Sequence, residues 1–488
     1  MNAPLPAPFA SLSPAPVWAH FALLCRTPRP SKHEGPLREQ LQAWAQARGL
    51  DTHVDAAGNL IVRKPASSGR EHEPVTALQG HLDMVCQKNT GSAHDFSRDP
   101  IQPVLGADGW LRATDTTLGA DNGLGVALIL AMLEDPTLSH GPLEALFTVD
   151  EEAGMGGAHG LEPGLLKAQR MINLDTEAWG EFYLGCAGGI DVDVRRPGCA
   201  EAAPAGHTGR RIALRGLRGG HSGVDIHEER GNAIQLLVRV LHDLAPRAGL
   251  RLAALQGGTA RNALPREAFA HVSLSPEAAA ALPQALALWQ GLLRHELAGV
   301  DEGLSLSCDD APVDEVLPTD EQAVWLDSLL ASPHGVHRMS RRVPGVVETS
   351  NNLGIIDLNP AGGHVNFMVR SLLDSGTQAL ARQIRSLWAL SGSTVTLSGA
   401  YPGWTPDPAS PLLALCQRVF QRTFGEASSV QVIHAGLECG LIGGKYPGLD
   451  IVSFGPTIQG AHAPGEGVDV ASVDRTWRLL CAVLAEPA

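Results

Sequence analysis

The sequence predicts an α/β protein that carries an inserted α+β domain. Short apolar runs that end in an acidic residue or a histidine recur along the first 175 residues, and segments with helical patterns lie between them. Between residues 190 and 400 the expected elements follow the order strand, helix, strand, strand, helix, strand, which is the order of a ferredoxin-like module. These two patterns predict one domain built on an open sheet and a second domain inserted into it.

The length of the chain supports two domains. A chain of 488 residues is longer than one hydrophobic core usually supports. We expect residues 1–189 and 401–488 to form the first domain and residues 190–400 to form the inserted domain. Apolar residues make up 44% of the chain and charged residues 18%, as in an ordinary soluble globular protein.

The charge balance and the apolar runs exclude several classes of partner. With 37 basic and 52 acidic residues the formal charge is -15, which argues against nucleic acid or an anionic membrane as a partner. The longest apolar run, residues 124–133, is too short to span a bilayer, and residues 1–16 do not resemble a signal peptide. The eight cysteines form no Cys-x-x-Cys pair, so we expect reduced thiols and a cytoplasmic protein.

The first domain begins with two expected helices in residues 17–50, followed by strands at 59–63 and 75–78. The second strand leads into His81 and Asp83, which share one face of an extended chain because they are two residues apart. In that arrangement Asp83 can orient a metal-binding His81. A hydrogen-bonded pair on the surface is the alternative.

Asp121 precedes an apolar run at residues 126–133 that we expect to be helical. An ordinary N-cap is one interpretation of an aspartate at this place. The neighbouring Gly119, Gly123 and Gly125 also allow the backbone to approach an ion closely, so a metal ligand is the other.

Two further strands end in carboxylates. The run at residues 143–149 leads into Asp150, Glu151 and Glu152, and the run at 171–174 leads into Asp175. Ligand sites of open α/β sheets lie at the C-terminal ends of strands. Of two adjacent glutamates there, one can bind a metal and the other can act as a base toward water. A solvated acidic turn is the alternative for the glutamates alone.

The inserted domain follows a clear order of elements. We expect strands at 211–215, 250–255, 268–275 and 304–307 and helices at 232–244 and 283–297, then strands at 354–358, 364–372 and 394–397 and a helix at 378–390. The first domain should then be completed by helices at 411–424 and 473–484 and strands at 430–433 and 450–454.

Two histidines follow expected strands in the C-terminal quarter. They are His434 and His462, and each lies in a loop rich in glycine. Spacing alone does not choose between them as a ligand.

Together these segments resemble a known family. The motifs are Gly-His-Leu-Asp-Met-Val at 80–85, Leu-Gly-Ala-Asp-Asn-Gly at 118–123, Asp-Glu-Glu-Ala-Gly-Met at 150–155, Ile-Asn-Leu-Asp-Thr-Glu at 172–177 and Gly-Ala-His at 460–462. In this order, around an inserted domain, they resemble the co-catalytic zinc aminopeptidase/carboxypeptidase superfamily, and within it the aminoacyl-histidine dipeptidases. The resemblance extends to the segments 185–189, 218–223, 261–265, 369–373 and 434–440, so it covers nearly the whole chain. It implies a zinc-exopeptidase-like domain with a mixed sheet flanked by helices and a ferredoxin-like lid domain.

The resemblance implies a site for two divalent metal ions. Asp121 would bridge them, with His81 and Asp175 on one ion and Glu152 and His462 on the other, so the family pattern favours His462 over His434. Oxygen ligands with two imidazoles suit zinc, with manganese or cobalt as alternatives. Three carboxylates do not neutralise two divalent cations, so such a site favours deprotonation of its own water.

The resemblance also implies roles for two other acids. Glu151 would be the general base, and Asp83 would orient or tune His81. No position of this core set departs from the family pattern.

In the lid domain the resemblance implies that His221 donates to the oxyanion, often across a dimer interface, so we expect a homodimer. A turn histidine in a glycine-rich loop is the alternative. Asn262 and Arg370 are candidates for holding the C-terminal carboxylate of the substrate, because a guanidinium suits a carboxylate. A structural ion pair is the alternative for Arg370.

The expected function is therefore that of a cytosolic metallo-dipeptidase that cleaves Xaa-His and related dipeptides, with small peptides as its partners. An N-acyl amino acid deacylase on the same scaffold is one alternative, because the metal chemistry is shared. A non-catalytic peptide-binding protein is the other, although binding alone would not need Glu151.

Overall fold

The computed structural model describes residues 7–487, so part of the segment 1–16 lies outside the described residues. Contacts divide the chain into two units. The first comprises residues up to 185 together with 406–432 and 437 onward, and the second comprises 186–405 and 433–436. The expected domain limits at 190 and 400 stay a prediction.

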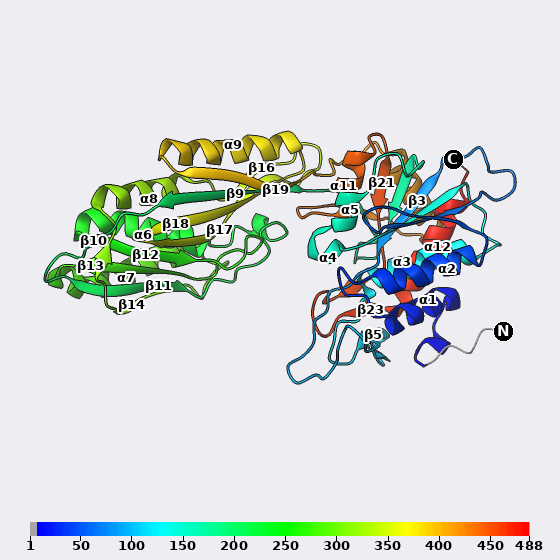
Figure 1. The fold of residues 1–488 in the computed structure, drawn as a ribbon, viewed down its shortest axis with the longest axis horizontal. Helices are drawn as coiled ribbons and strands as arrows, with labels where there is room; N and C mark the ends of the chain where they lie inside the picture. The colour runs from blue at the N-terminus through cyan, green and yellow to red at the C-terminus, as the bar shows by residue number, and fades with distance from the viewer. Residues whose placement is uncertain (1–6, 488) are drawn as a thin grey trace. The chain divides into compact units, whose positions relative to one another are not determined.

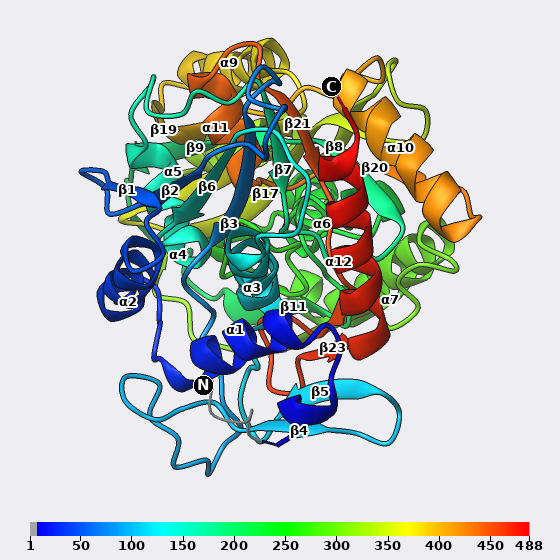
Figure 2. The ribbon, with the colours of Figure 1, turned by 90° about the vertical axis from the view of Figure 1, so that its right-hand side faces the viewer.

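The first unit is built on an eight-stranded mixed sheet, which Figure 2 shows from β1 to β20. The central strands β6, β3, β7 and β21 are parallel, while β1 and β2 join β6 in antiparallel fashion. The order of the strands is β1 (Asp51–Val54), β2 (Leu60–Lys64), β6 (Leu143–Thr148), β3 (Thr76–His81), β7 (Arg170–Asn173), β21 (Asp450–Ser453), β8 (Glu181–Cys186) and β20 (Ser429–Ile433).

Strands β3 and β6 are buried at every position, because parallel strands in the middle of a sheet are covered on both faces. Helix α3 (Ala120–Glu134) is apolar on all sides and packs between β3 and α1 (Ala15–Arg26). The remaining helices of this unit are η1 (Phe9–Ser11), α2 (Gly35–Gln46), α4 (Glu151–Gly154), α5 (Gly156–Gly160), α10 (Pro411–Phe424), α11 (Glu438–Lys445) and α12 (Val470–Ala485).

A small second sheet completes the first unit. Its strands, in spatial order, are β22 (Ile458–Gln459), β23 (Gly467–Asp469), β5 (Trp110–Ala113) and β4 (Pro103–Leu105). It brings the C-terminal loop with His462 into the same unit as the loop that precedes α3.

The second unit contains a long antiparallel sheet with helices packed on it (Figure 1). Its strand order is β14 (Ser305–Asp310), β11 (Thr208–Arg215), β13 (Ala268–Leu274), β12 (Arg251–Gly257), β17 (Val347–Asn359), β18 (Gly362–Ser371), β9 (Gly188–Pro197) and β19 (Thr394–Tyr401), with β16 (Gly335–Met339) paired to β17. The helices are η2 (Ile226–Glu228), α6 (Ala233–Ala248), α7 (Pro276–Glu296), α8 (Thr319–Ala331) and α9 (Asp374–Leu390), and β10 (Glu201–Ala202) pairs with β15 (Glu315–Val316).

The expected ferredoxin-like module is present in this unit. Strands β11, β12, β13 and β14 with helices α6 and α7 follow the expected chain order, and in space the fourth strand lies beside the first and the third beside the second. Four more strands extend this module into a continuous sheet. The fold class predicted from the sequence is therefore confirmed.

Several element boundaries differ from those expected. Helix α7 begins at Pro276 rather than at 283, because Ser275 caps it by accepting a hydrogen bond from the Ala278 N–H. Strand β9 was not among the expected elements, since its residues include Gly188, Gly189 and Pro197. Of the helices described between residues 7 and 487, none is both long enough and apolar enough to cross a membrane.

Candidate metal centre

The sheet of the first unit brings the predicted acidic and histidine residues together. His81 is the last residue of β3, Glu151 and Glu152 begin the short helix that follows β6, and Asp175 comes two residues after β7. These three strands are parallel neighbours, so their C-terminal ends meet at one edge of the sheet. This arrangement agrees with the expectation that a metal site forms at the C-terminal ends of these strands.

One group of ligand atoms surrounds His81. Its Nε2 atom lies 3.2 Å from Oδ1 of Asp121 and 3.4 Å from Oδ1 of Asp175. The ring is almost fully buried. The three side chains offer one nitrogen and two carboxylate oxygens within 4.8 Å of one another.

A second group of ligand atoms surrounds His462. Its Nε2 atom lies 3.3 Å from Oδ2 of Asp121 and 3.1 Å from Oε2 of Glu152. Asp121 is therefore shared: one of its oxygens faces His81 and the other faces His462. His434, the other histidine that spacing allowed, belongs to the second unit and is hydrogen-bonded to Ser350 there.

The donor set fits two divalent cations. Oδ1 of Asp175 and Oε1 of Glu152 are buried, and neither has a hydrogen-bond partner among the described residues. A buried carboxylate oxygen without a partner is costly unless a cation or a proton compensates it. Two imidazoles and three carboxylates are ligands that zinc and manganese both accept.

Asp121 is not the N-cap of the following helix. Its backbone lies at a kink near the start of α3, with a non-helical ψ of 117°. Its side chain points instead to the two histidines. The N-cap interpretation is wrong because tertiary contacts decide the direction of this side chain.

Asp83 holds two parts of the site in place. Its Oδ1 and Oδ2 accept hydrogen bonds from the backbone N–H groups of Glu151 and Glu152 at 3.0 and 3.1 Å, and Oδ1 lies 3.3 Å from Nδ1 of His81. Ser31 donates a further bond of 2.7 Å to Oδ2. Burial would raise the pKa of Asp83, but His81 and the other donors lower it to about 2. An ionised Asp83 thus links the histidine of β3 to the glutamates after β6.

Charge within the site shifts the titration of its members. Hydrogen bonds to Asp121 and Glu152 raise the pKa of His462 to about 11. Burial and the neighbouring acids raise the pKa of Asp175 to about 7, although His81 opposes this.

Glu151 lies beside these ligands. One of its carboxylate oxygens lies within 4.8 Å of ligand atoms of His81 and Glu152. Burial raises the pKa of Glu151 well above its usual range; His81 opposes this, while Asp175, Glu438 and Glu152 add to it. Such a group holds a proton more readily than an exposed glutamate.

Glu438 is a further buried acid to which we assigned no role from the sequence. Its Oε2 accepts hydrogen bonds of 2.6 Å from both Gln79 and Thr148, which lie near the ends of β3 and β6. Burial raises its pKa to about 7. The only local signal was a glutamate in an otherwise apolar and glycine-rich motif, and such a signal does not reveal its partners.

In the second unit the structure determines the tautomer of His221. Its Nδ1 accepts hydrogen bonds from the N–H groups of Gly223 and Val224 at 3.2 and 3.0 Å. Burial and the charge of Arg370 lower the pKa of His221 to about 4. The ring is therefore neutral near pH 7 and carries its proton on Nε2, from which it can donate.

Arg370 is a buried cation in the same unit. It donates a 2.9 Å hydrogen bond to the Tyr401 hydroxyl, and among the described residues its Nε has no partner and no ion pair includes Arg370. The alternative of a structural ion pair is thus wrong for the described part of the chain. Asn262, the other candidate for carboxylate binding, is exposed.

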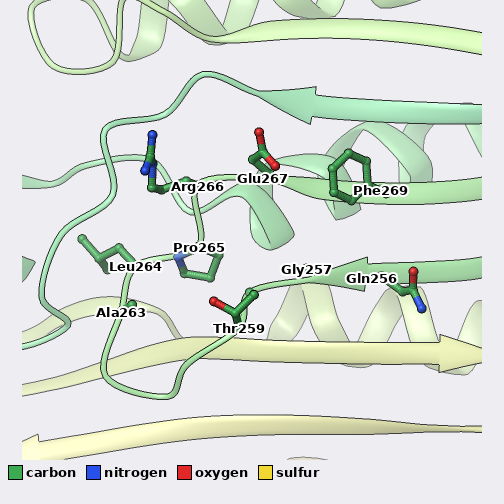
Figure 3. Close-up of a pocket in the computed structure, with 10 residues that line it drawn as sticks. Gln256, Gly257, Thr259, Ala263, Leu264, Pro265, Arg266, Glu267 and Phe269 are labelled. Atoms are coloured by element: carbon green, nitrogen blue, oxygen red, sulfur yellow. The ribbon is translucent and has the colours of Figure 1, made fainter. Parts of the chain in front are cut away.

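A separate pocket of about 550 Å³ lies in the second unit beside the end of β12 (Figure 3). Gln256, Thr259, Arg266, Glu267 and Phe269 contribute its larger side chains. None of the predicted site residues lines it.

Known proteins that are similar to this chain belong to a peptidase family. Residues 77–486 match the model of the family described as Peptidase family M20/M25/M40. The chain is 45% identical over 478 residues to the cytosol non-specific dipeptidase of Escherichia coli K12, and the match covers 98% of each chain. Among solved structures it is similar to aminoacylhistidine dipeptidase from Vibrio alginolyticus, with a TM-score of 0.92, 43% identity and coverage of 99% of this chain and 98% of that one.

A more distant structure shares the fold alone. Aminopeptidase PepT from Bacillus cereus matches with a TM-score of 0.56 at 16% identity, over 97% of this chain and 98% of that one. The family match and the coverage of the first relative together show that the chain belongs to peptidase family M20/M25/M40.

Proposed function

We propose that this protein is a cytosolic, metal-dependent dipeptidase that hydrolyses Xaa-His and related dipeptides. The observation that carries the proposal is the pair of ligand groups that share Asp121 and have Glu151 beside them. Family membership makes the chain a peptide-bond hydrolase, and the two similar proteins are named as dipeptidases. Neither a deacylase nor a non-catalytic binding protein is favoured by these relatives.

The residues that would hold the cations are those whose oxygens and nitrogens converge. His81, Asp121 and Asp175 would hold one ion, and Asp121, Glu152 and His462 the other. Two bound divalent ions, which we expect to be zinc, would polarise the scissile carbonyl group and lower the pKa of water.

Glu151 would act as the general base. It accepts a proton from the attacking water as the oxygen of that water bonds to the carbonyl carbon, and it returns the proton to the nitrogen when the C–N bond breaks. Asp83 would position Glu151, because its carboxylate accepts hydrogen bonds from the backbone N–H groups of Glu151 and Glu152.

The second unit would supply groups that bind the substrate. The neutral His221 has a free Nε2–H for the oxyanion that forms at the carbonyl oxygen. The guanidinium of Arg370, whose Nε has no partner among the described residues, would bind the C-terminal carboxylate, with Asn262 as a second candidate. If His221 acts across the interface of a homodimer, separated monomers should lose activity even with both metals bound.

The proposal is tested by hydrolysis of β-alanyl-histidine and a small set of other dipeptides. We expect metal-loaded protein to cleave them, and we expect metal-stripped protein and the Glu151→Ala variant to leave them intact. N-acetylated amino acids serve as the comparison substrates. Cleavage of these in preference to dipeptides would refute the proposal in favour of a deacylase, and tight metal binding without any turnover would refute both.

A further inference from the structure

Two buried residues of opposite charge contact the backbone of the segment that carries Asp121. They are Arg29, in the link between α1 and α2, and Glu466, in the C-terminal loop four residues after His462. Each is only 2% exposed, and neither is a candidate ligand or base. Nothing in the proposed chemistry requires either charge, so their burial calls for another explanation.

Glu466 accepts four backbone hydrogen bonds from consecutive residues. Its Oε2 accepts from the N–H groups of Leu118 and Gly119 at 2.8 and 3.0 Å, and its Oε1 accepts from those of Ala120 and Asp121 at 2.7 and 3.2 Å. All four N–H groups point to one carboxylate. The conformation of the segment is thereby fixed up to the backbone of Asp121 itself.

Arg29 contacts carbonyl groups in two segments of the site. Its Nη2 donates to the Gly119 carbonyl at 2.5 Å, and its Nη1 donates to the carbonyls of Leu82 and Asp83 at 3.0 and 2.8 Å. Gly119 has a φ of 69°, which favours glycine, and a Cβ atom there would collide with the Arg29 guanidinium. A glycine at position 119 therefore leaves the space that the Arg29 side chain occupies.

These contacts join three segments that hold predicted ligands. Arg29 joins the segment after His81 to the segment before Asp121, and Glu466 joins that segment to the loop of His462. His462 has a positive φ of 65°, which is uncommon for a residue other than glycine, and its side chain is half-exposed. The anchor at Glu466 keeps its loop beside Asp121.

We propose that Glu466 and Arg29 form a backbone clamp that positions Asp121 and His462 for metal binding. This inference rests on the proposed function, because it concerns the same ligands. Both are positioning residues, since they contact backbone rather than substrate. Side-chain partners that orient metal ligands typically change metal affinity 10- to 100-fold when they are replaced.

The test is the Glu466→Gln variant, in which an NH₂ group would face two of the four backbone N–H groups. We expect the dissociation constant for Zn²⁺, measured by competition with a chelator, to rise about 10- to 100-fold. Activity should return toward the wild-type value as the Zn²⁺ concentration is raised, with the KM for β-alanyl-histidine unchanged.

Glu144→Gln is the matched control. Glu144 is also buried and accepts backbone N–H groups of Lys167 and Ala168 at 2.7 and 3.1 Å, but it lies near the opposite end of β6 from Glu151. We expect this variant to lose thermal stability without any change in Zn²⁺ affinity.

The clamp is refuted if Glu466→Gln binds Zn²⁺ as tightly as wild-type protein, or if Glu144→Gln weakens binding equally. If Glu466→Gln does not fold, Arg29→Lys tests the other half of the clamp by the same measurement, and unchanged affinity there refutes the proposal. Failure of the proposed function has a different signature. In that case wild-type protein would bind Zn²⁺ and cleave no dipeptide, while the difference in affinity between the variants would remain.

Discussion

Replacing Asp83 by asparagine should weaken both the fold of the first unit and its metal site. The Asp83 side chain is 0% exposed and accepts bonds from the N–H groups of Glu151 and Glu152 and from the Ser31 hydroxyl. Asparagine retains one oxygen, so its NH₂ group faces one of the backbone N–H groups that Asp83 now accepts. A hydrogen bond to a charged group contributes about 1.5–3 kcal/mol, and a buried donor without a partner costs about 1–3 kcal/mol.

These contributions overlap, because one changed atom causes both. We therefore expect the free energy of unfolding to fall by about 2–4 kcal/mol, measured by urea denaturation of metal-free protein. Since Asp83 also orients His81, the dissociation constant for Zn²⁺ should rise about 10- to 100-fold.

Asp301→Asn is the matched control for this change. Asp301 is equally buried and accepts the N–H groups of Arg218 and Gly231 at 2.6 and 2.7 Å, but it lies in the second unit. It should lose stability with Zn²⁺ affinity unchanged. The reasoning is refuted if Asp83→Asn keeps wild-type affinity, or if the two variants lose affinity alike.

Three further variants test other groups. Glu151→Gln should bind metal normally but lower kcat by about 10²- to 10⁴-fold, and a smaller loss in steady-state assays would exclude it as the base. Arg370→Met should raise the KM for dipeptides by about 10- to 100-fold, because it loses about 1.5–3 kcal/mol of hydrogen bonding to the substrate carboxylate. The KM for dipeptide amides should rise less, and an equal rise for both would contradict carboxylate binding. His434 has a pKa of about 3, mainly because it is buried, so below pH 6.5 the unfolded chain takes up a proton that the folded chain does not. His434 should therefore contribute a fall in stability of about 1.4 kcal/mol for each pH unit between 6.5 and 3. The His434→Gln variant should show a shallower acid dependence in urea denaturation, and an unchanged slope would contradict this.

Much of the fold could be predicted because its patterns are local. The strands that end near His81, Glu151 and Asp175 are continuous apolar runs, and such runs form buried strands wherever they lie in a sheet. The ferredoxin-like module was recognisable from the order of its elements. Boundaries were predicted less well, as for α7, because Ser275 offers a better helix start than Pro283 does.

The buried charges of the first unit could not be predicted in this way. Glu466 contacts backbone more than 340 residues earlier in the chain, and Arg29 contacts a segment 90 residues later. No periodicity or spacing rule connects positions that far apart. For the same reason Glu438 stood out in its motif without showing that Gln79 and Thr148 are its partners.

The sequence by itself determined which segments become strands and helices, because backbone propensity and apolar spacing act over a few residues. It also supplied, through resemblance to a family, the list of residues from which a metal site could be built. Only the tertiary structure decided that the two oxygens of Asp121 face different histidines, and it agrees with the family pattern that His462 rather than His434 lies beside Asp121. The physical reason is that such contacts depend on the order of strands in the sheet and on the long-range packing of loops, which no local pattern encodes.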